Sequence, residues 1–488
     1  MLRCFLAFFV LARAFGQEAS TGSRVDEIFR QWDNRSSPGC ALAVMRDGAI
    51  VYKRGYGMAD LDHDIPIMPS SVFHVASLSK QFTAAAIVLL AQQGKLSLDD
   101  EVRKYIPELP DFGVPITIRH LIHHTSGLRD QWNLLELAGW RYSLDLITDD
   151  DVLQMIARQK DLNFPPGEKF MYCNTGYTLL AQIVKRVSGQ SFREFTTARI
   201  FQPLGMKSTH FRDDHAEIVK GQAYGYLPAG KTFRLSMPNF DTVGATSLLT
   251  TVEDLARWDE NFYEPRVGGR KLIRQLLEPG KLNSGETLDY AFGLKIGSNR
   301  GLPIVDHAGA EAGYCAHLIR FPEQHFSIAC LCNLSTADPG GLVRKVADLY
   351  LSAKMKQPAR PFIPPRKIYV SDVDPTPAKL REYAGVYRSD EMEAVYGFVV
   401  KDGQLLLERL KRKPERLRPL TPDTFRGRDG VFRFVRDSGG EVSGAVLDSE
   451  RVKNFRLRRD PVSDAAEQFS PPAPAPARAP APAQRILR

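Results

Sequence analysis

Two polar residues open an otherwise apolar stretch, "HVASLSKQFTAAAIVLLAQQGKL", at residues 74–96. Ser77 and Lys80 stand three positions apart, so in a helix they would lie on one face. Burial of an unpaired ammonium is costly unless its pKa falls, and an unprotonated amine can take the proton of a serine hydroxyl. The positive end of the helix would also favour alkoxide character at Ser77. This S-x-x-K pattern, which occurs once in the chain, predicts a serine nucleophile with a lysine base.

A second pair of polar residues precedes another apolar helix, in "FMYCNTGYTLLAQIVKRVSGQ". Tyr172 could relay a proton to a leaving group, and the Asn174 amide could both donate to and accept from an amide-bearing substrate. The alternative is a tyrosine that packs at a helix start beside an asparagine cap. We expect Tyr172 to act in catalysis and Asn174 to bind substrate.

The third stretch, "IVDHAGAEAGY", places His307 and Gly309 at the entry to a predicted strand. Because Gly309 has no Cβ, a substrate could lie close against the strand edge, and a nearby backbone N–H could form an oxyanion hole with that of Ser77. His307, with an ordinary pKa of about 6.5, would hold a substrate carboxylate only when protonated. A structural histidine is the alternative.

Other reaction types lack support in the sequence. Ser126 in "HHTSGL" is not part of a G-x-S-x-G elbow, and neither H-E-x-x-H nor a pair of cysteine ligands suggests a metal. We therefore expect no metal and no cofactor.

The elements that must position these residues follow from the hydrophobic pattern. Residues on either side of Asp47 and Gly48 alternate, which predicts a hairpin, and the helix at 74–96 should end at Gly94. The middle of the chain is mostly helical, and strands follow in "DYAFGLKIG", "YCAHLIRF" and "FSIACLCN" before a last helix in "GGLVRKVADLYLSAKM". This order predicts an α/β (α+β) fold in which helices flank an antiparallel sheet, whose first and last strands meet around a helical insertion.

The N-terminus, "MLRCFLAFFVLARAFGQEAS", has a basic residue, a short apolar run and small residues before Gly16. This pattern predicts a signal peptide at 1–16, and the run is shorter than the ~20 residues of a membrane span. We expect a periplasmic or secreted protein with no stable membrane span after cleavage.

Composition divides the rest of the 488 residues. A proline-rich segment separates two folded parts, and the second part shows the short alternating runs of a small all-β barrel. A Pro/Ala-rich segment follows the second part. The expected parts are a catalytic domain at 24–355, a linker at 356–373, a β domain at 374–460 and a disordered tail at 461–488.

The net charge of +8 is unevenly distributed. Residues 401–460 contain 16 Lys and Arg against 10 Asp and Glu, so this stretch supplies +6 of the total. A solvated basic face accounts for it, and attraction to an anionic cell envelope is the functional alternative. No motif indicates nucleic acid, and we expect no nucleic-acid partner.

Five cysteines remain after removal of the signal peptide, so at least one is free or paired between chains. If Phe321 pairs with Phe326 in a hairpin, Cys315 stands opposite Cys332, and a bridge between these strands is geometrically allowed. A slip of one residue would remove it.

Taken together and in this order, the three stretches resemble the serine β-lactamase and D,D-peptidase superfamily, in the branch of class C β-lactamases, D,D-carboxypeptidases, D-aminopeptidases and related esterases. The likeness extends over about residues 24–355 through "MRDGAIVYKRGYGMADL", "TIRHLIHHTSGL", "GATSLLTTVEDLARW" and "FGLKIG". From "LREYAGVYRSDEM" onward, the chain is similar to the lipocalin-like β domain often appended to these hydrolases.

The resemblance assigns roles to individual residues. It implies that Ser77 is the acylated nucleophile, with Lys80 as its base partner and Tyr172 as a proton shuttle. It also implies that Asn174 binds the substrate amide and that Ala310 supplies the second oxyanion N–H. His307 stands where β-lactamases carry the lysine of K-T-G. The H-x-G variant is familiar in the D,D-carboxypeptidase and D-aminopeptidase members, which argues against efficient β-lactam hydrolysis but not against acylation by penicillin.

We therefore expect a secreted serine hydrolase that acts on a small D-amino-acid peptide, an ester or a β-lactam through an acyl-enzyme. The alternatives are a class C-type β-lactamase and a catalytically silent protein that binds peptidoglycan or peptide. We favour a substrate with a free D-terminal carboxylate, for which kcat/KM should fall as pH rises through the pKa of His307. For a neutral ester or amide, kcat/KM should show no such fall with rising pH.

Overall fold

The computed structural model describes residues 21–358 and 376–461, apart from 143, 410 and 411. The predicted signal peptide, most of the linker and the tail from residue 462 lie outside the described residues. The chain divides into two compact units, Met1–Lys367 with Arg451–Lys453 and Ile368–Glu450 with Asn454–Arg488.

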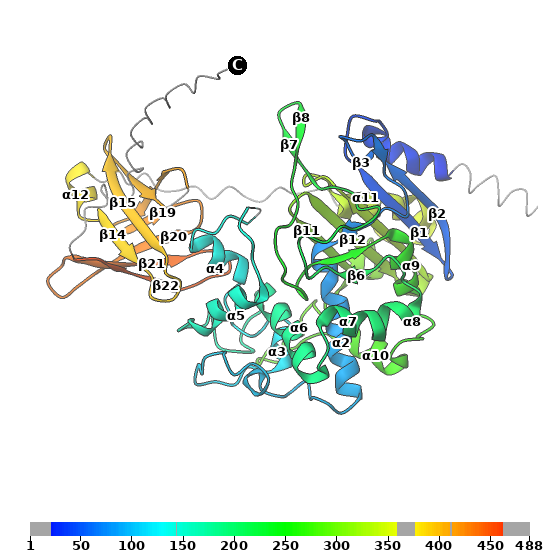
Figure 1. Ribbon diagram of the computed structural model, residues 1–488, viewed down its shortest axis with the longest axis horizontal. Helices are drawn as coiled ribbons and strands as arrows, with labels where there is room; N and C mark the ends of the chain where they lie inside the picture. Colours follow the sequence, from blue (N-terminus) through cyan, green and yellow to red (C-terminus); the bar gives the residue numbers. More distant parts are fainter. Residues whose placement is uncertain (1–20, 143, 359–375, 410–411, 462–488) are drawn as a thin grey trace, which may run out of the picture. The chain divides into compact units, whose positions relative to one another are not determined.

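A six-stranded antiparallel sheet, in the order β10-β11-β12-β13-β1-β2, forms the centre of the first unit (Figure 1). Its strands are β1 (Cys40–Arg46), β2 (Ala49–Tyr56), β10 (Lys295–Asn299), β11 (Leu302–Glu311), β12 (Tyr314–Phe321) and β13 (Phe326–Cys332). The first strand of the chain pairs with the last strand of the sheet, β1 with β13. This pairing and the helices inserted between the two ends confirm the predicted fold class.

The predicted turns and strands are mostly present. Asp47 and Gly48 join β1 to β2 with φ angles of 51° and 77°, as a two-residue hairpin turn requires. The stretch "DYAFGLKIG" becomes a strand only from Lys295, because the segment before it turns away with Gly293 at φ 71°.

Helices cover both faces of the sheet. On one face, α11 (Pro339–Leu351) packs Val343 and Val346 into a cluster with Ile319 and Ile328. Side chains alternate along a strand, so Arg320 points to the opposite face, where it pairs with Asp259 of α9 (Val252–Glu260). The central strands β12 and β13 are consequently buried at every position.

The helical insertion surrounds α2 (Ser79–Gln92), which is buried without interruption from Ser79 to Leu90. It packs against α6 (Asn174–Ser188) and α10 (Gly269–Leu276). The other helices of the insertion are α3 (Ile118–Ile122), α4 (Gln131–Leu137), α5 (Asp149–Ala157), α7 (Phe192–Thr196) and α8 (Gln202–Leu204). Its short strands are β3 (Met58–Asp60), β4 (Ile65–Pro66), β5 (Phe73–His74), β6 (His210–Phe211), β7 (Tyr226–Ala229), β8 (Thr232–Leu235) and β9 (Leu248–Thr250). Although α2 begins with polar residues, its continuous burial places it in the interior of this unit.

A nine-stranded antiparallel sheet forms the second unit and curls into a nearly closed barrel, as the sequence predicted. Its strands are β14 (Gly385–Arg388), β15 (Val395–Lys401), β16 (Gln404–Glu408), β17 (Glu415–Arg416), β18 (Arg418–Thr421), β19 (Thr424–Arg426), β20 (Val431–Arg436), β21 (Val442–Asp448) and β22 (Phe455–Arg459), and they follow α12 (Pro377–Arg381). Phe432 and Phe434 alternate with exposed residues along β20, and with Phe398 they fill the barrel interior.

Among the residues described, no helix has both the length and the apolar character needed to cross a membrane.

The disulfide is not the Cys315–Cys332 bridge that the hairpin register would allow. The hairpin register is confirmed, because Phe321 pairs with Phe326 and Cys315 stands opposite Cys332. However, Cys332 also faces Cys40 on its other neighbour, β1, and the disulfide joins Cys40 to Cys332. The free Cys315 thiol instead donates to the carbonyl oxygen of Ser335. One sulfur can form one bridge, so the partner from the distant strand excludes Cys315.

The disulfide should contribute measurably to stability, since it closes a loop across 292 positions of sequence. The double variant Cys40→Ala, Cys332→Ala should lower the free energy of unfolding by about 2–4 kcal/mol in urea denaturation under oxidising conditions. Cys315→Ala removes a buried thiol without a cross-link and serves as the control. A peptide map that links Cys315 to Cys332 would contradict the pairing.

Candidate active site

Ser77 lies in a single 3-10 turn, η2 (Ala76–Leu78), that leads directly into α2. The serine is therefore held just before the helix rather than within its first α-helical turn. Its neighbours Ala76 and Leu78 are buried, whereas Ser77 is partly exposed. Ala76 has a φ of 49°, a conformation that a residue with a side chain seldom adopts unless its surroundings impose it. The local fold thus leaves Ser77 partly exposed between two buried neighbours.

Lys80 is fully buried and makes three hydrogen bonds through Nζ. It donates to Ser77 Oγ at 3.1 Å, to Asn174 Oδ1 at 2.9 Å and to the carbonyl oxygen of Ala245 at 2.7 Å. The spacing of three residues therefore does bring the amine to the hydroxyl. The sequence could not indicate the Ala245 carbonyl, because a backbone oxygen is present at every position.

Burial lowers the pKa of Lys80 to about 7, against an opposing effect of the negative charges of Asp130 and Glu311. Removal from water destabilises the charged form of an amine, and here that effect is larger than the attraction of the two carboxylates. Near neutral pH the amine is therefore divided between its charged and neutral forms.

Asn174 links Lys80 to a buried carboxylate. Its Nδ2 and its backbone N–H both donate to Asp130 Oδ2, at 2.9 and 2.6 Å. A carboxylate accepts hydrogen bonds here, so the amide nitrogen must face Asp130 and the amide oxygen must face Lys80. Asn174, which the sequence predicted to bind substrate, thus has protein partners for both its amide oxygen and its amide nitrogen. Asp130 also caps α4 through the N–H of Trp132, which is the only role its sequence context suggests.

The loop that carries Ala245 is held against two helices. Thr83 of α2 donates to the carbonyl oxygen of Gly244 at 2.7 Å. Gly244 has a φ of 95°, and a Cβ there would lie 2.5 Å from the carbonyl oxygen of Tyr177 in α6. A glycine is therefore required at this position, and it fixes the neighbouring Ala245 carbonyl beside Lys80.

Tyr172 is positioned by a residue that the sequence reasoning missed. The two residues that flank Tyr172 in the chain both donate to His124. The Met171 N–H donates to the His124 carbonyl oxygen, and the Cys173 N–H donates to His124 Nδ1. The rings of His124 and Tyr172 lie 4.2 Å apart between centroids. His124 stands in "HHTSGL", a stretch whose pattern gives no sign of this contact.

Tyr172 lies against both Ser77 and Lys80. Lys80 Nζ is 4.8 Å from the centre of the tyrosine ring, and the tyrosine hydroxyl hydrogen-bonds with Ser77. Burial raises the pKa of Tyr172 further above its ordinary value, although the hydrogen bond with Ser77 opposes this. The phenol is therefore neutral at physiological pH.

The end of β11 borders the serine. β10 pairs with β11 only from Leu302 to Asp306, so His307–Glu311 are paired on one side, with β12. A Cβ on Gly309 would lie 2.3 Å from the carbonyl oxygen of Val75 and 3.1 Å from Ser77 N. Gly309 thus allows the strand to approach the Ser77 backbone, and exposed Ala310 follows it.

His307 does not behave as its ordinary pKa suggested. Burial, followed by the nearby charge of Lys80, lowers its pKa to about 3. Its Nδ1 lies 2.6 Å from the Ala308 carbonyl oxygen, which can only accept, so Nδ1 carries the hydrogen. Its Nε2 must then accept from Tyr290 Oη at 3.1 Å. The expectation of a histidine that titrates near neutrality was wrong, because the side chain is enclosed.

Two clusters among the described residues have ligand atoms close enough for a metal ion. In the first, two of the three cysteines, Cys40 and Cys332, form the disulfide, which leaves Cys330 as the remaining thiol. The second, at the surface, consists of Asp214, His215 and Asp241. Neither cluster includes a residue of the network around Ser77.

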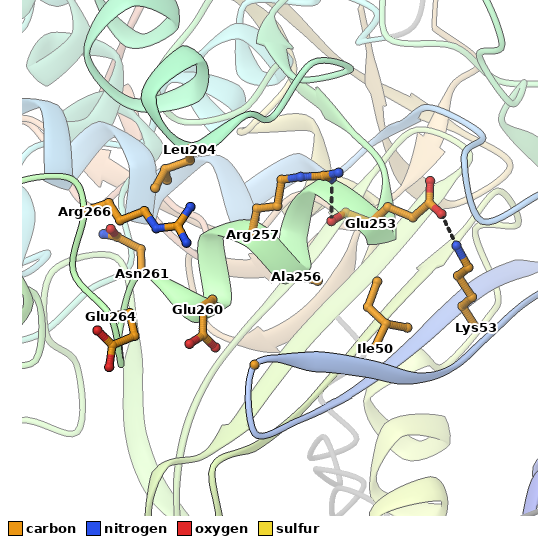
Figure 2. A pocket seen from close by; sticks show the side chains of 11 residues that line it. Ile50, Lys53, Leu204, Glu253, Ala256, Arg257, Glu260, Asn261, Glu264 and Arg266 are labelled. Carbon is orange, nitrogen blue, oxygen red and sulfur yellow. Dashed lines mark hydrogen bonds and ion pairs between the residues drawn. The ribbon is translucent and has the colours of Figure 1, made fainter.

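The hollow shown in Figure 2, of about 410 Å³, has a different character. Lys53 and Arg257 lie along it, and Lys53 is paired with Glu253 at 2.5 Å. No serine, threonine or cysteine is among its lining residues. It offers no nucleophile, so the candidate site remains the Ser77 network.

Comparisons with known proteins show which family the chain is similar to. A model of the Beta-lactamase family matches residues 25–351. Penicillin-binding protein 4* of Bacillus subtilis (strain 168) is 34% identical over 311 residues, 60% of this chain and 68% of that protein. The D-aminopeptidase of Gluconobacter oxydans (strain 621H) is 29% identical over 301 residues, 62% of this chain but only 56% of that enzyme.

A solved structure shows a similar fold. The octameric penicillin-binding protein homologue from Pyrococcus abyssi aligns with a TM-score of 0.59 and 25% identity, over 90% of this chain and 99% of that chain.

Asp130 should control the proton affinity of Lys80. Because its negative charge raises the pKa of Lys80 against the effect of burial, Asp130→Asn should move that pKa below about 7. The Cε resonance of Lys80 in lysine-labelled protein, followed by NMR against pH, measures the change. Asp99→Asn, at an exposed acid paired with Arg119, is the control. A Lys80 pKa that is unchanged or higher in Asp130→Asn would contradict the network.

Proposed function

Because this chain belongs to the beta-lactamase family, we propose that it is a periplasmic or secreted serine hydrolase that forms an acyl-enzyme on Ser77. The proposed substrates are D-amino-acid peptides or amides and small esters. The observation that carries the proposal is the set of three hydrogen-bond partners around Lys80 Nζ.

The three partners determine where a neutral Lys80 directs its lone pair. A neutral amine has two hydrogens, and the oxygens of Asn174 and Ala245 can only accept. These two oxygens therefore take both hydrogens, and the lone pair remains for the third partner, the hydroxyl of Ser77. The arrangement suits a general base, since the pKa of about 7 leaves much of the amine neutral near physiological pH.

The proposed reaction begins as Lys80 takes the Ser77 proton and Ser77 Oγ bonds to the substrate carbonyl carbon. The backbone N–H groups of Ser77 and Ala310 would hold the resulting oxyanion. Tyr172 then gives its proton to the leaving nitrogen or oxygen as the carbonyl bond to that atom breaks, and it recovers a proton from Lys80. Water attacks the acyl-enzyme by the same path in reverse and releases the acid.

The neutral state of His307 bears on the substrate. With a pKa of about 3, the imidazole carries no charge near neutrality and offers no cation to a substrate carboxylate. We therefore favour peptides, amides and esters without a terminal carboxylate beside the scissile bond over the D,D-carboxypeptidase-like substrates expected from the sequence. The D-aminopeptidase relative is consistent with that choice.

A penicillin tests the nucleophile directly. The wild type should gain one penicilloyl group per chain, because β-lactams acylate the active serine of this family, and Ser77→Ala should gain none. Intact-mass spectrometry reads the adduct. Ser126→Ala removes another buried hydroxyl and should still be labelled. A wild type without adduct, or an adduct that survives in Ser77→Ala, would refute the assignment.

The pH dependence tests the base. With p-nitrophenyl acetate, a neutral ester, kcat/KM should rise about tenfold per pH unit below about 7 and level off above it, because only unprotonated Lys80 accepts the Ser77 proton. Lys80→Arg keeps the positive charge but does not lose its proton, so it should reduce the rate about a hundredfold or more. An acid limb centred near pH 10 would show that Lys80 is not the depressed base.

A further inference from the structure

Glu311 is an acidic residue at the active-site end of β11 with no assigned role. It stands two positions after Gly309, and side chains two apart along a strand leave the same face. That face lies against the Ser77 backbone, since a Cβ on Gly309 would be 3.1 Å from Ser77 N. Glu311 is partly exposed at this end of the strand.

A second contact places the Glu311 carboxyl beside the catalytic lysine. Thr246 Oγ1 donates to Glu311 Oε2 at 3.1 Å, and the preceding residue, Ala245, accepts from Lys80. The carboxyl and the amine are therefore held by neighbouring residues of one loop. None of the proposed acyl-transfer steps uses the Glu311 carboxyl.

The surroundings of the Glu311 carboxyl set its proton affinity. Burial raises the pKa of Glu311 to about 8, Lys80 opposes that rise and Asp130 adds to it. His74, which faces Thr246 Oγ1 at 3.4 Å, is kept neutral by burial, with a pKa of about 3. Within the described part of the chain, no salt bridge pairs Glu311 with an arginine or lysine.

We infer that Glu311 binds the α-ammonium group of the substrate, so that the enzyme selects peptides, amides or esters of an amino acid whose amino group is free. This inference rests on the proposed acyl-enzyme at Ser77. In such a substrate the nitrogen is two covalent bonds from the scissile carbonyl carbon. Glu311 directly follows Ala310, the proposed oxyanion donor, so the nitrogen falls within its reach.

The substrate amine and the Glu311 carboxyl can form an ion pair by exchanging one proton between them. α-Amino groups have pKa values of about 8, close to that of Glu311. When a neutral amine meets the protonated carboxyl, the proton passes from oxygen to nitrogen and an ammonium–carboxylate pair forms without exchange with solvent. Glu311 offers no positive charge to a substrate carboxylate at the same place, whether its own carboxyl is protonated or ionised.

A matched pair of substrates tests the inference at pH 8. Wild-type kcat/KM for D-alanine p-nitroanilide should exceed that for N-acetyl-D-alanine p-nitroanilide, and Glu311→Gln should reduce this ratio about tenfold or more, as expected for a hydrogen bond between charged groups. Glu311→Asp should retain a ratio above that of Glu311→Gln. Glu323→Gln, at an exposed acid elsewhere on the surface, is the control and should leave the ratio unchanged. A ratio near one in the wild type, or one that Glu311→Gln does not change, would overturn the inference.

The wild type provides a second readout that needs no variant. D-alaninamide should inhibit hydrolysis of p-nitrophenyl acetate at about one tenth of the concentration needed with N-acetyl-D-alaninamide. Equal inhibition would overturn the role of Glu311 while ester hydrolysis still supported the acyl-enzyme. Absence of both ester hydrolysis and a Ser77 adduct would instead refute the proposed function itself.

Discussion

The hydrogen-bond geometry at Lys80 Nζ is the constraint on which the site depends. Two partners, Asn174 Oδ1 and the Ala245 carbonyl, can only accept, and the third is the Ser77 hydroxyl. Burial makes the neutral amine accessible near pH 7, and the two acceptors then orient its lone pair. An isolated buried lysine would satisfy only the first condition, because burial would favour its neutral form but nothing would fix the direction of its lone pair.

Much of the surrounding fold serves to keep those acceptors in place. Asp130 determines which way the Asn174 amide faces, and Gly244 allows the loop of Ala245 to lie against α6. Gly309 lets β11 approach the Ser77 backbone, and the sheet that holds β11 is extended by the pairing of β1 with β13. Residues from several distant parts of the chain therefore determine one proton transfer.

The sequence alone predicted the sheet, its helical insertion, the barrel and the nearness of Ser77 to Lys80, because these depend on hydrophobic period and helix geometry. It did not predict contacts made by backbone atoms or through long loops. Examples are the hydrogen bond from Lys80 to the Ala245 carbonyl oxygen and the packing of His124 against Tyr172. The titration of His307 was misjudged for the same reason. Its environment, set by Tyr290 and the Ala308 carbonyl, is a property of the packed structure.

Neutron diffraction at pH 8 would test the central claim most directly, because it locates hydrogens on nitrogen and oxygen. Above the pKa of about 7, Lys80 Nζ should carry two hydrogens, directed at Asn174 Oδ1 and the Ala245 carbonyl oxygen. The hydrogen between Nζ and Ser77 should be attached to Oγ. Three hydrogens on Nζ, or one of them directed at Ser77 Oγ, would contradict the account.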